Sequence, residues 1–378
     1  MCGGTQSGVT SVAFHVDQLF ARVPGGIGTY VRELLPALTA ADDSLEITPF
    51  HSRWRRPPPE DLAALHPVQL RRGIRGLYPS WNAVGRPSLP RRLAALDILH
   101  LPSPVAVPPA GSSQRVVVTV HDLAFRLLPR LYPAAWRTLY RTGLRRAARR
   151  ADAIIAISSR TAADLVRMAR VDPARIHVIP LAASLPTRPD DPEPALRRLR
   201  IPRPYVLFVG TLEPRKNLVR LIRAYRRTAV RLPHALVLTG PLGWHSQRLH
   251  REVAVPGPGR VILTGPVPEA DLDALYRGAE AFCYPSLYEG FGLPVLEAMA
   301  RGVPTITSSA SSLPEIAGRA AVIVEPRSVR DLSAALERIL TDGDEAVRLA
   351  TMGRERAAEF SWRRTARMTI DVYDKVRA

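Results

Sequence analysis

The sequence of 378 residues predicts an α/β fold of two Rossmann-like domains, each a doubly wound parallel sheet, facing each other across a cleft. The length is about twice that of an average domain, which favours two separate cores. Short β-branched runs alternate with amphipathic stretches, the order that gives parallel strands joined by crossover helices. One proline-rich segment interrupts this alternation. Because open parallel sheets bind ligands at the carboxyl ends of their strands, the cleft is the expected ligand site.

Residues 1–180 are expected to form the N-terminal domain. VTSVAFHV (9–16) predicts its first strand, and IGTYVRELLPAL (27–38) predicts the helix that follows. Further short apolar runs are typical of strands buried on both faces: DILHLPS (97–103), VVVTVHDL (116–123) and ADAIIAISS (151–159). A helical pattern, AAWRTLYRTGLRRAARR (134–150), lies before the last of them.

Residues 181–204 contain six prolines and several charges, so we interpret them as an interdomain linker without a core. Strand and helix patterns resume in 205–360, which are expected to form the C-terminal domain. Its predicted strands are 205–210, 234–240, 260–265, 281–286, 303–309 and 320–326, and helical patterns cover 217–229 and 271–279. Residues 361–378 are expected to form a helix that packs back on the N-terminal domain.

The composition is that of a globular protein, with 46% apolar residues and a mean hydropathy of −0.04. No apolar run approaches the roughly 18 residues that a membrane span needs. The first residues lack a basic stretch followed by an apolar one, so no signal peptide is expected. Two cysteines are too few for a disulfide framework or a zinc site. A cytoplasmic location fits these features.

The net charge of +19 suggests a partner that carries phosphates or an anionic surface. Only Lys216 and Lys375 are lysines, however, and the arginine excess is also what a GC-rich genome would produce without selection for binding. A nucleic-acid-binding protein is therefore an alternative. It is disfavoured because the sequence has no concentrated basic patch with interleaved aromatic residues, and aromatic residues make up only 6%.

The segment YVLFVGTLEPRKNLVRLI (205–222) predicts an anion site. Its strand ends at Gly210, and Arg215 and Lys216 precede a helix that Asn217 is suited to cap. The N–H groups at a helix N-terminus favour an anion, and arginine can bind a phosphate with two parallel hydrogen bonds. The motif therefore indicates a diphosphate clamp. The alternative is a solvated basic loop.

The segment AFCYPSLYEGFGLPVLEAMA (281–300) places two acids around a glycine-rich turn. Glu289 is expected in a loop at the carboxyl edge of the sheet, and Glu297 about one turn inside the helix that Pro294 begins. A carboxylate can accept hydrogen bonds from two vicinal hydroxyls, so two acids suit a ligand with two sugars. Alternatively, Glu297 only favours the helix dipole and Glu289 is a surface residue.

Together these motifs resemble those of glycosyltransferase family 4, retaining enzymes with the GT-B fold that use nucleotide-sugar donors. The resemblance covers nearly the whole chain. Five further segments match in the same order: GGIGTY (25–30), HDLAF (121–125), ADAIIAISS (151–159), GPVPEADLDALY (265–276) and SSLPEIAG (311–318).

The resemblance implies roles for individual residues. Arg215 and Lys216 would hold the donor diphosphate and stabilise the leaving nucleotide, Glu297 would bind the donor ribose, and Glu289 would lie near the transferred sugar. His121 would lie near the reacting carbon. Other implied donor-binding positions are Gly26, in the loop with Gly25 and Gly28, then Gly210, Val267 and the backbone of Gly290, Phe291, Gly292 and Leu293.

His121 follows a buried strand and therefore lies at the carboxyl edge, where a neutral imidazole could bond to the sugar. A purely structural histidine is the alternative. Asp271 and Asp273 form a DLD sequence, which we read as the acidic first turn of a helix and not as a magnesium site. No metal and no cofactor besides the nucleotide-sugar co-substrate are expected.

The function expected from the resemblance is transfer of a hexose, mannose or a similar sugar, to a glycan or lipid-linked acceptor in bacterial polysaccharide or glycoconjugate assembly. No carboxylate is placed as an obvious nucleophile, so front-face attack is expected, with a donor phosphate oxygen accepting the proton of the acceptor. A GT-B-like epimerase or phosphorylase is the alternative. The arginine-rich helix 134–150 is typical of a core stripe with a solvated basic face, and is also compatible with peripheral contact with an anionic membrane.

Overall fold

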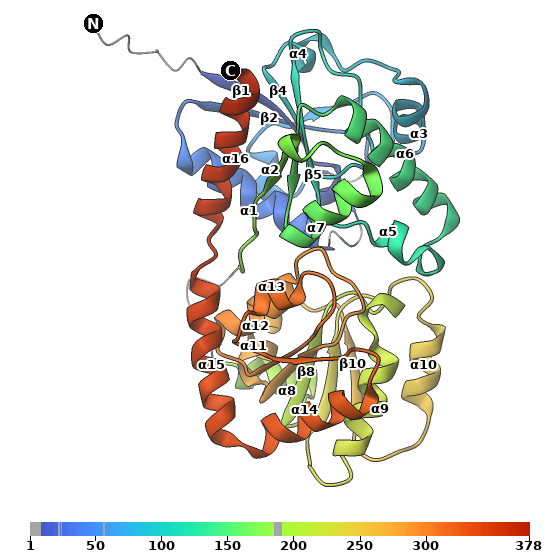
Figure 1. The fold of residues 1–378 in the computed structure, drawn as a ribbon, viewed down its shortest axis with the longest axis vertical. Helices are drawn as coiled ribbons and strands as arrows, with labels where there is room; N and C mark the ends of the chain where they lie inside the picture. The colour runs from blue at the N-terminus through green and yellow to red at the C-terminus, as the bar shows by residue number, and fades with distance from the viewer. Residues whose placement is uncertain (1–8, 22, 24, 56, 185–190) are drawn as a thin grey trace, which may run out of the picture. The chain divides into compact units, whose positions relative to one another are not determined.

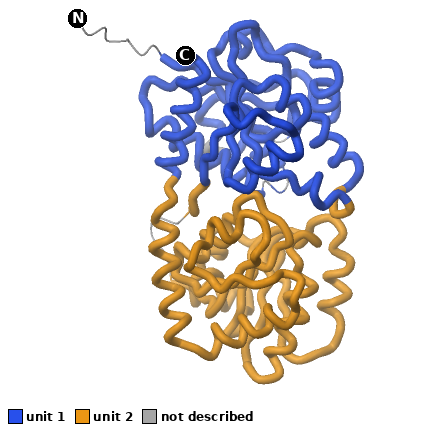
Figure 2. The backbone as a smooth tube through the Cα atoms, in the orientation of Figure 1, with its two compact units in different colours: residues 1–129, 133–180, 362–378 blue, residues 130–132, 181–361 orange. Residues whose placement is uncertain are grey.

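The computed structural model describes residues 9–21, 23, 25–55, 57–184 and 191–378 (Figure 1). The chain divides into two compact units (Figure 2). Unit 1 comprises Met1–Pro129, Pro133–Pro180 and Trp362–Ala378, and unit 2 comprises Arg130–Tyr132 and Leu181–Ser361. Within the described residues, no helix combines the length and the hydropathy needed to cross a bilayer.

Unit 1 contains a seven-stranded parallel sheet in the order β3-β2-β1-β4-β5-β6-β7. Its strands are β1 (Thr10–His15), β2 (Leu45–His51), β3 (Val68–Gln69), β4 (Ile98–Leu101), β5 (Arg115–Val120), β6 (Ala153–Ala156) and β7 (Ile176–Val178). The direction in which strands are added reverses between β1 and β4. In a parallel sheet such a reversal opens a crevice at the carboxyl ends of the strands.

The helices of unit 1 cover both faces of this sheet (Figure 1). They are α1 (Gly25–Ala41), α2 (Glu60–Ala63), α3 (Ile74–Val84), α4 (Arg91–Ala94), α5 (Ala124–Leu127), α6 (Ala134–Arg150), α7 (Ser159–Asp164) and α16 (Trp362–Arg377). The last of these, α16, packs against α1 although more than 300 residues separate them in the sequence. The hydroxyl of Thr365 donates to the carbonyl of Pro180 at 2.7 Å, which fixes the start of α16 to unit 1.

Unit 2 contains a six-stranded parallel sheet in the order β10-β9-β8-β11-β12-β13. Its strands are β8 (Tyr205–Val209), β9 (Ala235–Thr239), β10 (Val261–Gly265), β11 (Ala281–Tyr284), β12 (Thr305–Ser308) and β13 (Val322–Val324). Its helices are α8 (Glu193–Leu199), α9 (Leu218–Thr228), α10 (Gln247–Ala254), α11 (Glu269–Gly278), α12 (Leu293–Ala300), α13 (Leu313–Ala317), α14 (Val329–Thr341) and α15 (Gly343–Ala358). The reversal here lies between β8 and β11, so the loops that follow these two strands are neighbours.

The expectation that 181–204 form a linker without a core is wrong for the residues that the structure describes there. Residues 193–199 form α8, which packs against α11, and Leu196 is buried. Arg198 also forms an ion pair with Asp271 of α11. The prolines delimit this short helix because proline suits the start of a helix, and the helix joins the core of unit 2. Residues 185–190 of the expected linker lie outside the described residues.

Candidate active site

Two loops at the carboxyl edge of the unit 2 sheet are joined into one structure. One loop follows β8 and contains a turn of 3₁₀ helix, Pro214–Lys216, and the other connects β11 to α12. The backbone N–H of Leu287 donates to the carbonyl of Arg215 at 2.9 Å, and Nη1 of Arg215 donates to the carbonyl of Tyr288 at 2.9 Å. The strand order explains this contact, because β8 and β11 are hydrogen-bonded neighbours.

Asn217 contributes to this junction in a way that the sequence did not predict. It precedes α9, but its side chain does not cap that helix. Instead, Nδ2 donates to the carbonyls of Pro285 at 3.0 Å and Pro326 at 2.6 Å. The left-handed backbone of Asn217, with φ of 64°, turns the amide toward the neighbouring loops, and asparagine tolerates this conformation better than most residues.

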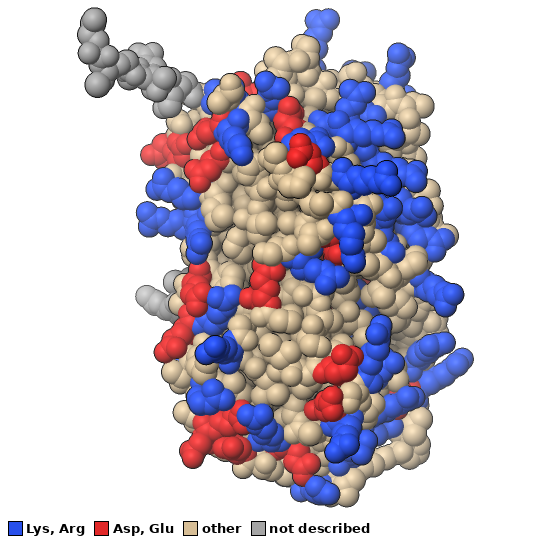
Figure 3. Space-filling view, viewed as in Figure 1, with Lys and Arg blue, Asp and Glu red and all other residues tan. Residues whose placement is uncertain are grey.

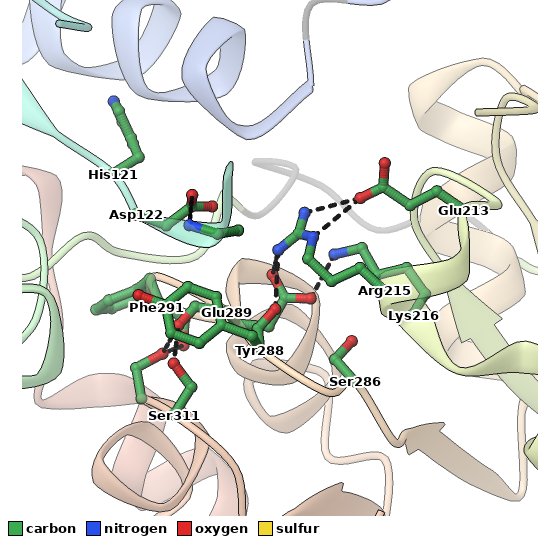
Figure 4. A network of polar contacts seen from close by, with 12 residues as sticks. His121, Asp122, Glu213, Arg215, Lys216, Ser286, Tyr288, Glu289, Phe291 and Ser311 are labelled. Atoms are coloured by element: carbon green, nitrogen blue, oxygen red, sulfur yellow. Dashed lines mark hydrogen bonds and ion pairs between the residues drawn. The ribbon is translucent and has the colours of Figure 1, made fainter. Parts of the chain in front are cut away.

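The centre of the site is a carboxylate shared by two cations (Figure 4). Nζ of Lys216 lies 2.6 Å from Oε1 of Glu289, and Nη1 of Arg215 lies 2.8 Å from Oε2 of the same carboxylate. A second acid, Glu213, contacts Nη2 of Arg215 at 2.9 Å. Nζ of Lys216 also donates to the hydroxyl of Tyr284. Two positive and two negative side chains therefore balance each other in this cluster.

The cluster is largely withdrawn from water. The side chains of Lys216 and Glu289 are each 8% exposed, and that of Arg215 is 14% exposed. Burial raises the pKa of Glu289, but the adjacent charges of Arg215 and Lys216 outweigh this effect and hold that pKa at about 2. Burial lowers the pKa of Lys216, and Glu289 offsets part of the decrease. Glu289 is therefore ionised at neutral pH.

Because Glu289 is ionised in the folded protein, the stability of the fold depends on pH. Its pKa in the folded protein lies below the usual value of 4.5. The stability that it contributes is therefore present above about pH 4.5 and is lost as the pH falls toward 2. Alanine at position 216 or 289 is therefore expected to destabilise the fold as well as the site, because each change removes a counter-charge from a buried group.

A third segment, SSLPEIAG (311–318), holds the backbone of the Glu289 loop. The buried hydroxyl of Ser312 lies 3.0 Å from the carbonyls of both Glu289 and Phe291, and Ser311 also donates to the carbonyl of Glu289. Gly292 directly precedes α12 with φ of 110°, and a Cβ at this position would lie 2.6 Å from a methyl group of Leu313. Residues 290–293 are all buried, so this glycine-rich turn is rigidly packed.

Glu297 has its own set of partners. Its Oε2 accepts a hydrogen bond from the hydroxyl of Tyr276 on α11 at 2.8 Å. The guanidinium of Arg301 lies over the Tyr276 ring, 5.0 Å from its centre, and Nε of Arg301 lies 2.7 Å from Asp273. Glu297 is half-buried at the contact between α11 and α12. Its assignment as a ribose ligand stays a prediction.

The other donor positions in unit 2 lie at the ends of strands. Gly210 follows β8 with φ of 145°, and the side chain of Lys216 packs 3.8 Å from where its Cβ would be. Val267 lies half-buried between β10 and α11.

The DLD sequence at 271–273 forms part of the start of α11, as predicted. Asp271 pairs with Arg198, and Asp273 pairs with Arg301. In the part of the chain that the structure describes, no group of three or more histidine, cysteine or acidic side chains is arranged to hold a metal ion.

His121 lies at the carboxyl end of β5 in unit 1, where the sequence placed it. Its Nε2 lies 2.9 Å from the carbonyl of Pro102. Because a carbonyl only accepts, Nε2 carries the hydrogen and Nδ1 is left as an acceptor. Burial lowers the pKa of His121 to about 4, so the imidazole is neutral at pH 7. Asp122, the next residue, accepts a hydrogen bond from the N–H of Ala124 at 2.9 Å and so caps the turn that follows.

The glycine-rich segment of unit 1 forms the first turn of α1. Gly25 and Gly26 are exposed, and Gly28 is buried. Gly25 has φ of 60°, a conformation that glycine adopts without strain.

Comparisons with known proteins agree with this architecture. A family model described as Glycosyltransferase Family 4 matches residues 24–185, and one described as Glycosyl transferases group 1 matches residues 196–356. The O-antigen chain mannosyltransferase B of Escherichia coli is 33% identical over 267 residues, which cover 69% of this chain and 70% of that protein. The MMP alpha-(1->4)-mannosyltransferase of Mycolicibacterium hassiacum is 35% identical over 237 residues, 61% of this chain and 56% of that protein.

Solved structures share the fold at low sequence identity. Sucrose-phosphate synthase from Thermosynechococcus elongatus superposes with a TM-score of 0.72 at 22% identity, covering 97% of this chain and 98% of that one. Anabaena HepE in complex with UDP and glucose gives a TM-score of 0.72 at 16% identity, covering 97% and 100%. Fold and sequence thus define a glycosyltransferase with the GT-B fold. The chain belongs to glycosyltransferase family 4.

Glu213, Tyr284 and Ser312 are site residues that the sequence analysis missed. Glu213 stands two residues before Arg215, and this spacing is the one signal that could have indicated an ion pair. The sequence pattern identified Tyr284 only as part of a buried strand. The role of Ser312 depends on β12 lying beside β11, which no local pattern shows.

A double-mutant cycle tests whether Lys216 and Glu289 act as one unit. Lys216→Met or Glu289→Gln alone should destabilise unit 2 by about 3–5 kcal/mol. The first change leaves the buried Glu289 compensated by Arg215 alone, and the second removes the carboxylate that both cations share. The double variant should lose less than the sum, with a coupling energy of about 1–3 kcal/mol. Urea unfolding, combined with hydrogen exchange of the β8 and β11 amides, measures these changes.

The exposed pair Arg231–Glu337 in the same unit is the matched control for this cycle. Its two side chains are 73% and 41% exposed, so solvent screens their attraction and their coupling should be close to zero. Additive effects at Lys216 and Glu289, equal to those of the control pair, would contradict the ion pair.

Proposed function

We propose that this glycosyltransferase moves a hexose from a nucleoside diphosphate sugar to a glycan or lipid-linked acceptor with retention of anomeric configuration. The observation that carries the proposal is the buried contact of Glu289 with both Arg215 and Lys216 at the carboxyl edge of the unit 2 sheet. This edge is where open parallel sheets bind their ligands. The N-terminus of α12 and its buried glycine-rich turn lie at the same edge.

The two cations suit the diphosphate of the donor. Nζ of Lys216 has three N–H donors, of which Glu289 and Tyr284 take two, so one is left for a phosphate oxygen. Negative charge grows on the leaving diphosphate as the bond to the sugar breaks. Cations that other side chains already hold in place stabilise this charge without rearranging, which is the main way such sites accelerate reactions.

The pairing of Glu289 favours front-face attack. Both of its carboxylate oxygens contact cations, so the group is a poor nucleophile toward the sugar carbon. In the proposed step the acceptor hydroxyl forms the new bond to that carbon while the bond to the diphosphate breaks. The proton of the acceptor passes to a phosphate oxygen of the leaving group. We assign Glu289 to holding Lys216 charged and in position beside the transferred sugar.

The neutral imidazole of His121 is proposed to accept a hydrogen bond from a sugar hydroxyl through Nδ1, and Glu297 to bind the donor ribose. Metal independence is part of the proposal, since Arg215 and Lys216 supply positive charge and the DLD acids are paired with arginines. Two relatives named as mannosyltransferases support a mannosyl donor. HepE, which shares the fold, was solved with UDP bound, so guanosine and uridine diphosphate sugars are both worth testing.

A transfer assay tests the proposed role of Arg215. Arg215→Ala should lower kcat by about 100- to 1,000-fold, because it removes a charge that stabilises the leaving group. Glu289 keeps Lys216 as a partner in this variant, so the pair at the centre of the site should persist, while Glu213 loses its contact with Arg215. Release of nucleoside diphosphate from GDP-mannose and UDP-glucose measures the rate, and NMR of the product gives its anomeric configuration.

Arg231→Ala is the control for this assay, since it changes the same residue type at an exposed position in the same unit. Full activity of Arg215→Ala would refute the assignment of this residue. An inverted product would refute the retaining step. A change in the sugar without an acceptor would instead favour an epimerase.

We also propose that α6 makes peripheral contact with the inner face of an anionic membrane. Arg141 and Arg145 lie one turn apart on the exposed face of α6, and Trp136 at its start is 41% exposed. The pKa of Arg126 is lowered by burial and by the nearby charges of Arg141 and Arg145, because like charges gather here. Basic side chains are dense over this part of unit 1 (Figure 3). The opposite stripe of α6 packs into the core through Leu144 and Ala147, as its pattern predicted.

Vesicle binding tests this contact. Replacing Arg141, Arg145 and Arg149 together by glutamine should weaken binding to phosphatidylglycerol vesicles on the order of 100-fold, at about 1 kcal/mol per arginine. The control replaces three exposed arginines of unit 2, Arg227, Arg248 and Arg251, with the same change in net charge. Equal losses in both triple variants, or equal binding of the unaltered protein to phosphatidylcholine, would exclude a specific role for α6.

A further inference from the structure

A chain of hydrogen-bonded polar groups crosses the core of unit 1, and the proposed reaction does not use it. It begins at Tyr373 on α16, whose hydroxyl contacts Nδ1 of His100 on β4. Nε2 of His100 lies 2.9 Å from the hydroxyl of Thr119 on β5, which lies 2.9 Å from the hydroxyl of Tyr30 on α1. All four side chains are at most 1% exposed.

Such a chain is costly unless all of its members are paired. A buried hydroxyl or imidazole without a partner costs about 1–3 kcal/mol. Burial lowers the pKa of His100 to about 3, so its ring is neutral, with one nitrogen donating and the other accepting. His100 therefore bridges Thr119 and Tyr373 only while both hydroxyls are in place. The chain fixes the position of each ring that it joins.

The chain ends beside His121. The ring of Tyr30 meets the imidazole of His121 edge to face, with centroids 5.0 Å apart and planes at 81°. Nε2 of His121 is held by the carbonyl of Pro102, and Thr161 donates to the backbone carbonyl of His121 at 3.1 Å. The Tyr30 ring therefore limits rotation of the imidazole and keeps water from that side of it. Among the described residues of unit 1, the titratable groups near His121 include Tyr30, His100 and the adjacent Asp122.

We propose that Tyr30 is a positioning residue for His121, and that Thr119, His100 and Tyr373 hold the Tyr30 ring in place through its hydroxyl. The catalytic consequence rests on the proposed function of His121, whereas the positioning itself does not. The C-terminal helix thereby acts on the imidazole through three intervening side chains. Loss of the Tyr30 ring admits water, so the pKa of His121 rises toward its usual value of 6.5. At pH 6 a large part of the imidazole is then protonated, and Nδ1 of that part no longer accepts a hydrogen bond.

Nitrogen NMR of the protein labelled with ¹⁵N-histidine tests the positioning directly. His121→Gln assigns the His121 signals in the spectrum. Tyr30→Leu keeps an apolar side chain in the core and removes the ring edge. The pKa of His121 should then rise from about 4 toward 6.5, and the Nε2–H tautomer should give way to a mixture. Tyr30→Phe keeps the ring but removes the hydroxyl that Thr119 holds, so it should raise the pKa of His121 by a smaller step than Tyr30→Leu does.

Leu34→Ala is the matched control, because Leu34 lies buried one turn further along α1. It creates a cavity on the same helix and should leave the His121 titration unchanged. An unchanged titration in Tyr30→Leu would overturn the proposal, whatever the activity of the protein. Tyr373→Phe tests the far end of the chain and should raise the pKa of His121 by a smaller step. An unchanged value in that variant would overturn the role of α16.

Kinetics separate this inference from the proposed function. Tyr30→Leu should lower kcat at pH 6 by about 10- to 100-fold with the donor KM unchanged, since a misplaced group slows the step without weakening binding. The acid limb of its pH profile should move to higher pH. The His121 signals could respond as expected while His121→Gln retains full transfer activity. That result would support the positioning role of Tyr30 and refute the catalytic role of His121.

Discussion

The site depends on one buried carboxylate that two cations share. Glu289 would cost several kcal/mol to ionise in the interior by itself, and so would Lys216. Together with Arg215 they form a buried cluster in which each charge is compensated by a neighbour at contact distance. The strand order keeps the three side chains together, because β8 and β11 are neighbours and direct their following loops toward each other. The hydroxyls of Ser311 and Ser312 then fix the carbonyl of Glu289 itself.

This arrangement determines how the proposed site would recognise an anionic donor. A cluster in which acids balance the cations does not attract anions by net charge alone, so selectivity rests on the direction of the remaining N–H donors. Glu213 and Glu289 keep Arg215 and Lys216 oriented while the donor is absent, and this lowers the reorganisation that binding would otherwise require. In unit 1, by contrast, the buried groups of the candidate site are neutral. Burial keeps His100 and His121 neutral, and carbonyls, hydroxyls and an aromatic ring orient them.

Much of the fold and part of the site could be predicted from the sequence. Runs such as 205–210 and 281–286 are short, apolar and rich in β-branched or aromatic residues. This pattern is typical of a buried parallel strand. Arg215, Lys216 and Glu289 could be expected together because they follow strands at the same edge. The pairing of Glu289 could not be predicted, because partners and burial depend on which strands are adjacent. Asn217 was misjudged because its left-handed backbone is invisible in the sequence, and α8 was missed because prolines surround a short helix.

The most direct measurement is a crystal structure of the protein bound to the nucleoside diphosphate that raises its melting temperature most. The account predicts a phosphate oxygen within hydrogen-bond distance of Nζ of Lys216 and of the Arg215 guanidinium, with Glu289 still in contact with Lys216. A diphosphate bound elsewhere on the protein, with these three side chains unchanged and without contact to it, would contradict the account.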